Sequence, residues 1–149
     1  MYHAIVRRRV REVFDHLSRG AWEPILEGLA DDVHHVFPGD NPLGGERRTR
    51  ASVADWFDRL GRLFPGHDFV VHRVVSRGFP WSTWVAVQWS ARLEPQTGDA
   101  YENEGAHWIH IRWGRVTAFH AYLDTERVSA ACAAMAAAGV EEAAAAPIP

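Results

Sequence analysis

The chain has 149 residues, of which 47% are hydrophobic and 23% are charged, and its formal net charge is −3. This composition fits one globular domain with a sizeable core and argues against a disordered chain. The slightly acidic balance provides no basic field for nucleic acid, although every basic residue is an arginine. We therefore expect a single domain over residues 1–149, with an ordered core at about 4–139.

The single cysteine, Cys132, excludes an internal disulfide framework, and its Ala-rich surroundings predict a small buried hydrophobe. The amino terminus has no apolar stretch of signal-peptide length. No segment reaches the roughly 20 apolar residues that a membrane helix needs. The simplest expectation is a cytoplasmic protein that engages neither a membrane nor nucleic acid.

The first part of the chain shows helical periodicity. Apolar residues recur at helical spacing from Ile5 to Leu17 and predict a first helix, followed by a short second helix over Trp22–Leu29. A short strand is predicted over Val33–Phe37. The turn formers of residues 38–45 predict a loop that can cover the mouth of a pocket. A third helix is predicted over Val53–Phe64, and its apolar stripe needs a sheet to lie on.

From His67 onward the hydrophobic period changes to two, which is typical of strands. The pattern predicts an antiparallel meander of four strands: Phe69–Ser76, Thr83–Leu93, Tyr101–Trp113 and Val116–Leu123. A last helix is predicted over Val128–Met135, and residues 140–149 read as an Ala/Pro tail without a packing face. Helices followed by a long antiparallel sheet predict an α+β domain, in which the curved sheet packs on the helices and encloses a cone-shaped space.

The last two predicted strands are joined by Trp113-Gly114-Arg115-Val116. Gly114 at the first central position of a two-residue turn favours type II′, which pairs Trp113 with Val116. Counting outward, His107 opposes Tyr122, and Gly105 leaves open space opposite a carboxylate. This register predicts a polar cluster on one sheet face, formed by Asn103, His107, His120, Tyr122 and Asp124. A titratable cluster on a core face is a candidate active site.

Several aromatic residues are large enough to line the predicted cone-shaped space. We expect Phe37, Trp56 and Trp89 to contact a ligand there, together with His35. The alternative is that these aromatic side chains only fill an ordinary core.

Four short segments carry a family resemblance: Phe14-Asp15-His16-Leu17, Leu29-Ala30-Asp31-Asp32-Val33, Pro42-Leu43-Gly44-Gly45-Glu46, and Trp113-Gly114-Arg115-Val116 with Tyr122-Leu123-Asp124. With the order of elements, they make the chain, from about Ile5 to Gly139, resemble the nuclear transport factor 2-like superfamily. More narrowly, the chain resembles the SnoaL-like polyketide cyclase and ketosteroid isomerase-like group. The resemblance implies a cone-shaped α+β roll, commonly a homodimer, with a cavity between the helices and the concave sheet face. Members include cofactor-free cyclases, isomerases, epoxide hydrolases, dehydratases and proteins that only bind.

In cyclase-like members an aspartate near the end of the last long strand acts as acid/base, and Asp124 matches it by strand position. The resemblance therefore implies that Asp124 removes a proton next to a carbonyl, while His107, Tyr122 or Asn103 stabilises the enolate oxygen by hydrogen bonding. No metal or organic cofactor is required. The residues expected to contact a small hydrophobic carbonyl compound are Asn103, His120, Trp56, Trp89, Phe37 and His35.

Two alternatives stay open beside the enzyme hypothesis. In a non-catalytic ligand-binding or dimerising module, Asp124 only caps the last helix. In a partner-binding domain, the contact is made by the outer sheet face, through Trp108, His110, Arg112 and Phe119.

The sequence has nine histidines, which raises the possibility of a metal site. Neither His34 with His35 nor His107 with His110 can ligate one ion from a strand, because the two side chains of each pair point to opposite faces. A site assembled across strands from His35, His107 and His120 is the remaining metal alternative, and we expect no metal.

Overall fold

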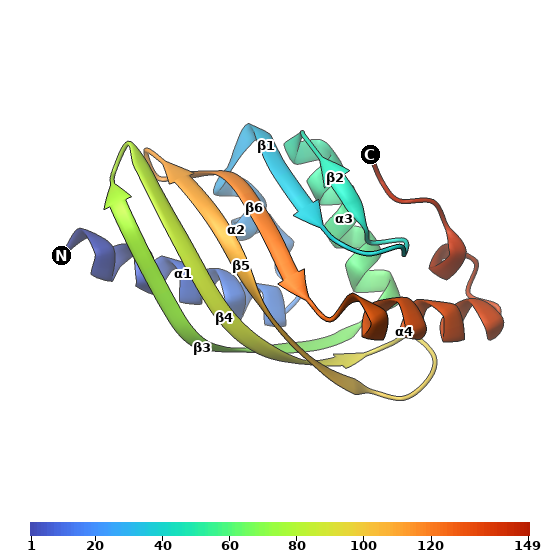
Figure 1. Cartoon of the computed structure of the whole chain (residues 1–149). Coiled ribbons are helices and arrows are strands. Elements are labelled where there is room, and N and C mark those ends of the chain that lie inside the picture. The colour runs from blue at the N-terminus through green and yellow to red at the C-terminus, as the bar shows by residue number, and fades with distance from the viewer.

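Two helices form the amino-terminal part of the computed structural model, which describes residues 1–149 (Figure 1). Helix α1 spans Tyr2–Ser18 and α2 spans Trp22–Glu27. The buried stripe of α1 consists of Val6, Val10 and Phe14. The first helix is therefore confirmed, whereas the second is shorter than predicted, because Leu29 already belongs to a strand.

Six strands form one curved sheet in the order β2-β1-β6-β5-β4-β3. The strands are β1 (Leu29–Phe37), β2 (Gly45–Arg47), β3 (Gly66–Phe79), β4 (Ser82–Glu94), β5 (Tyr101–Arg112) and β6 (Arg115–Leu123). All pairs are antiparallel except β1 with β6. The predicted α+β class and four-stranded meander are confirmed. The sheet does not close into a barrel, because β2 and β3 remain its two edges.

The helices α1, α2 and α3 lie on one face of the sheet, which curves around them (Figure 1). Helix α3 spans Arg50–Leu63 and begins at Thr49, whose side chain accepts a hydrogen bond from the Ser52 backbone N–H. Its apolar stripe packs into the core, as the periodicity predicted. The last helix, α4 (Thr125–Ala137), continues beyond the end of β6. None of the helices is both long enough and apolar enough to span a membrane.

The turn between β5 and β6 differs from the prediction. Its central residues are Trp113 and Gly114, both with positive φ, and Arg112 pairs with Arg115. Positive φ at both central positions is typical of a type I′ turn rather than a type II′ turn. A register shift then leaves Thr117 as an extra residue on β6, which makes a β-bulge.

This bulge decides which side chains of β6 face the helices. Beyond it, His107 pairs with Ala121 and not with Tyr122, so the predicted register is wrong by one residue. Because side chains alternate along a strand, the shift turns His120 and Tyr122 to the outer face and buries Ala121 completely.

The carboxyl-terminal segment packs against the domain, so the prediction of a tail without a packing face is wrong. Its short 3₁₀ helix, η1 (Glu141–Ala144), buries Ala143. Glu142 forms ion pairs with Arg59 and Arg62 of α3. The chain then turns back and ends beside β2 (Figure 1), where the carbonyl of Ile148 accepts a hydrogen bond from a buried arginine, Arg47.

Removing residues 141–149 should therefore destabilise the whole domain. The truncation removes the Ile148 carbonyl that accepts a hydrogen bond from the buried Arg47 side chain, and this loss reduces the free energy of unfolding by about 1–3 kcal/mol. Urea unfolding measures the change. The control is Glu141→Gln, since the Glu141 side chain is exposed and makes no hydrogen bond. A truncated protein with an unchanged urea midpoint would contradict the packing role of this segment.

Candidate functional site: an apolar cavity with two histidines

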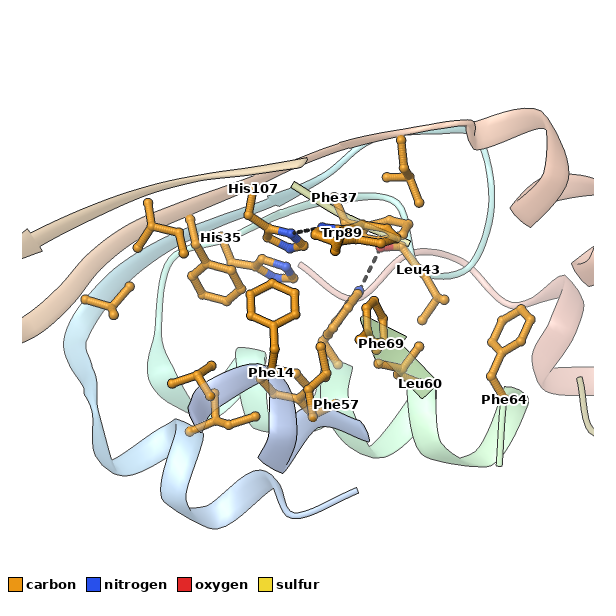
Figure 2. A pocket seen from close by; sticks show the side chains of 18 of the residues that line it. Phe14, His35, Phe37, Leu43, Phe57, Leu60, Phe64, Phe69, Trp89 and His107 are labelled. Carbon is orange, nitrogen blue, oxygen red and sulfur yellow. Dashed lines mark hydrogen bonds between the residues drawn. The ribbon is translucent and has the colours of Figure 1, made fainter. Parts of the chain in front are cut away.

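A cavity of about 160 Å³ lies between the concave face of the sheet and the helices. Of the 24 residues in its wall, 20 are hydrophobic. The wall draws on all four α-helices, the loop after β1, and the five strands other than β2 (Figure 2). An apolar cavity of roughly 150 Å³ is known to bind a benzene ring, so this space suits a ligand of about one or two rings.

Aromatic side chains from separate elements shape the cavity. Phe14 of α1 meets His107 edge to face, at 5.6 Å between ring centroids. Trp56 of α3 donates its indole N–H to the carbonyl of Leu43 at 2.8 Å, which ties the loop after β1 into the wall. The loop that was predicted to cover a pocket mouth thus contributes Leu43, which is buried.

Apart from the indole N–H groups of Trp56 and Trp89, the wall has polar side-chain atoms from three residues only: His35, Tyr101 and His107. No aspartate or glutamate lies there. The cavity therefore has no carboxylate that could act as a general base, and its acid/base chemistry depends on the two imidazoles and one phenol.

His107 is held by Trp89. The indole N–H of Trp89 donates to Nδ1 of His107 at 2.8 Å (Figure 2). His107 keeps part of its surface exposed, and this surface lies in the cavity wall. Burial, with a smaller effect from His120, lowers the pKa of His107 to about 4. The imidazole is neutral at physiological pH.

His35 is held by Arg47. The guanidinium Nε–H of Arg47 donates to Nδ1 of His35 at 2.9 Å, and the ring of His35 stacks on Phe119 with centroids 4.2 Å apart. Burial, followed by the charge of Arg47, lowers the pKa of His35 well below its ordinary value. The Nε2 atom of His35 is buried and has no hydrogen-bond partner.

Tyr101 adds a second unpartnered polar atom to the wall, because its hydroxyl is buried without a hydrogen bond. Burial raises the pKa of Tyr101 well above its ordinary value, so it stays a neutral phenol.

Cys132 behaves as the predicted small buried residue. Burial raises the pKa of its thiol to about 11, which makes a nucleophilic thiolate unfavourable.

The structure brings five of the predicted site residues together in the cavity wall: His35, Phe37, Trp56, Trp89 and His107. They come from β1, α3, β4 and β5. The periodic pattern predicted that these side chains face the core, and the structure places them there; their contact with a ligand stays a prediction.

Two predicted site residues face away from the cavity. Tyr122 is 54% exposed and stacks on His120 at 4.2 Å on the outer face of the sheet. Their placement in the cavity was wrong because the bulge at Thr117 shifts β6 by one residue. The same geometry removes the metal alternative, since His120 cannot converge with His35 and His107. No cluster of three or more His, Cys, Asp or Glu side chains is arranged to hold a metal ion.

Asp124 also lies outside the apolar cavity. Its side chain accepts hydrogen bonds from the backbone N–H groups of Glu126 and Arg127, and 47% of it is exposed. Asp124 therefore caps α4. Asn103 is buried beside it and donates to the Asp124 carbonyl at 3.0 Å, and both residues line a separate polar pocket outside the apolar cavity.

Three features of the site escaped the sequence analysis. Arg47 sits in a run of charged residues that resembles an ordinary surface, and Tyr101 was assigned only as the start of a strand. Gly105 was expected to leave open space, but a Cβ there would lie 3.0 Å from the Trp89 ring. A Cβ would also clash with the Tyr122 backbone carbonyl, so only glycine fits at position 105 beside the Trp89 ring.

The low pKa of His107 predicts a defined pH dependence of stability. Between pH 6.5 and about 4 the unfolded chain binds a proton that the folded state excludes, so stability falls as the pH falls through this window. His107 should contribute about 3 kcal/mol to this loss. His107→Phe should flatten the slope in urea unfolding across this range. His72→Phe, which changes an exposed histidine, should retain the slope because His107 is intact. Equal slopes in both variants would contradict the burial of a neutral His107.

Comparison with known proteins shows which family and fold the chain shares. Residues 10–119 match the SnoaL-like domain family. The structure is similar to an NTF2-like protein of unknown function from Burkholderia pseudomallei, with TM-score 0.72 and 20% identity over 82% of this chain and 92% of that chain. No curated protein matches the chain in sequence.

Two further solved structures carry enzyme names. One is a proposed polyketide cyclase from Xanthomonas campestris, with TM-score 0.58 and 18% identity over 80% of this chain and 90% of that chain. The other is a proposed scytalone dehydratase from Novosphingobium aromaticivorans, with TM-score 0.65 and 12% identity over 83% of this chain and 89% of that chain. Identities this low establish a shared fold only. From the family match and the fold together, the chain belongs to the SnoaL-like domain family of the NTF2-like superfamily.

Proposed function

We propose that this protein is a small-molecule enzyme of the cyclase or isomerase type, which acts on a hydrophobic carbonyl compound of about one or two rings. The observation that carries the proposal is the apolar cavity, whose wall contains two neutral imidazoles. A few polar groups in an otherwise apolar pocket are typical of sites that orient a small ligand.

The chemistry available to such a site is electrophilic. A neutral imidazole that donates a hydrogen bond to a carbonyl oxygen stabilises the negative charge that develops there when an enol carbon of the same substrate adds to the carbonyl carbon. The C–C bond forms as the carbonyl π bond breaks, and the enol O–H proton passes to the new alkoxide, so the step needs no carboxylate base. The surrounding aromatic wall excludes water and strengthens that interaction. In this proposal His35 and His107 stabilise the oxygen, and Asp124 remains outside the reacting centre.

The proposed polyketide cyclase and the proposed scytalone dehydratase share the fold, which supports enzymatic use of such a cavity. The second candidate is a non-catalytic binding module with the same cavity. The apolar wall and the absence of a carboxylate favour that candidate, because binding requires no base. Turnover of a compound that binds the cavity separates the two: consumption of ligand supports the enzyme, and its unchanged recovery supports the module.

Binding of small aromatic ketones should raise the melting temperature, because a ligand that binds only the folded state stabilises it. Val13→Phe should abolish the rise, since Val13 lines the cavity and the added ring occupies ligand space. The matched control is Ile5→Phe on the same helix, where Ile5 is 42% exposed and does not line the cavity. Asp124→Asn is a second control, because asparagine is also a good helix cap. A rise that survives in Val13→Phe would place the ligand elsewhere.

We also propose that the outer face of the sheet joins two copies of the chain. Large side chains gather there with much of their surface exposed, namely Val75, Trp84, Trp108 and Tyr122. Phe119, which was expected on this face, lies in the cavity wall instead. Exposed apolar patches of this kind mark interaction surfaces.

Light scattering after size exclusion should give the mass of a dimer, and Trp108→Glu should convert it to a monomer by burying a charge in the interface. Trp113→Glu, at the exposed hairpin tip, should keep the dimer. A monomeric wild-type protein would contradict this proposal and leave the cavity unaffected.

A further inference from the structure

Each cavity histidine accepts a hydrogen bond from a group that can only donate. The indole nitrogen of Trp89 and the guanidinium Nε of Arg47 carry protons and have no acceptor capacity. Because these donors lie 2.8 Å and 2.9 Å from the Nδ1 atoms of His107 and His35, both Nδ1 atoms must present a lone pair. A proton on either Nδ1 would face another N–H group.

The proton of each neutral imidazole therefore resides on Nε2. Neither Nε2 atom donates to a protein group, and that of His35 is buried. Two N–H donors cannot satisfy one another. Buried donors without partners are uncommon, so an acceptor supplied from outside the protein is the missing component.

The surrounding contacts keep both donors in place. Arg47 is fully buried, and three of its four remaining N–H groups donate to the carbonyls of Gly44, Gly45 and Ile148. Its guanidinium therefore cannot turn away from His35. Trp89 packs against Gly105, where no side chain other than hydrogen fits, and against Phe69 at 5.1 Å. The arrangement is rigid before any ligand enters.

We propose that Arg47 and Trp89 are positioning residues that hold the protons of His35 and His107 on Nε2, so that the cavity selects a ring compound whose oxygen accepts hydrogen bonds without donating one. The ligand class is a neutral ketone. This inference deepens the proposed function and rests on it. An ammonium group, which has no lone pair, would place a donor against two donors, and a hydrocarbon would leave both unsatisfied.

The test combines the state of the histidines with ligand choice. Long-range ¹H–¹⁵N NMR of the wild-type protein should show both Nδ1 atoms as unprotonated and both Nε2 atoms as protonated nitrogens. By calorimetry, 1-tetralone should bind roughly tenfold more tightly than tetralin, its hydrocarbon analogue of the same ring size. 1-Aminotetralin should bind more weakly than the ketone.

Variants connect the two measurements. Trp89→Phe removes the donor to His107, so the NMR signals of His107 should show a proton on Nδ1 in part of the population, and the preference for the ketone should shrink. His107→Phe should also reduce that preference, whereas His72→Phe should keep it. If Trp89→Phe fails to fold, the wild-type NMR spectrum still decides the position of the protons.

Each result separates this inference from the proposed function. A proton on Nδ1 of either histidine in the wild-type protein overturns the inference, even if ketones bind. Equal affinity for tetralone and tetralin overturns the ligand class and leaves a working cavity. No binding of any of the three compounds overturns both the ligand class and the proposed function.

Discussion

The β-bulge at Thr117 is the constraint on which the site depends. The type I′ turn alone would keep His107, His120 and Tyr122 on one face, because it moves the register by an even number of residues. The one extra residue of the bulge reverses the faces of β6. Phe119 and Ala121 consequently turn toward the helices, and the polar side chains of β6 turn outward. The same reversal makes the concave face apolar and concentrates aromatic side chains on the opposite surface.

The fold was largely predictable because its signals are periodic. Helical spacing in α1 and α3, and alternation from residue 66 onward, identified the elements and the antiparallel meander. The core-facing aromatics Trp56 and Trp89 followed from the same periodicity. The bulge has no comparable signal, since neither Thr117 nor its neighbours differ from ordinary strand residues. The carboxyl-terminal segment was missed for a similar reason, because its contacts with Arg47 and Arg59 are long-range hydrogen bonds that no local pattern encodes.

The site also shows how distant segments determine the chemistry of one group. His35 obtains its proton position from Arg47, and Arg47 is held by backbone carbonyls near Gly44 and at Ile148. A buried arginine without a carboxylate is unfavourable unless many acceptors surround it, and burial already lowers its pKa to about 10. The loop after β1, the edge strand β2 and the end of the chain therefore all contribute to the polarity of the cavity. Asp124, by contrast, serves the helix that follows it.

The central claim is that ligands occupy the concave cavity and that the cluster at Tyr122 and Asp124 plays no part. Nuclear Overhauser effects between a bound aromatic ketone and the protein test this most directly. We expect contacts from ligand protons to the rings of Phe14, Phe119 and His107, which line the cavity. Contacts to the ring of Tyr122 or to the first turn of α4, with none to Phe119, would contradict the account.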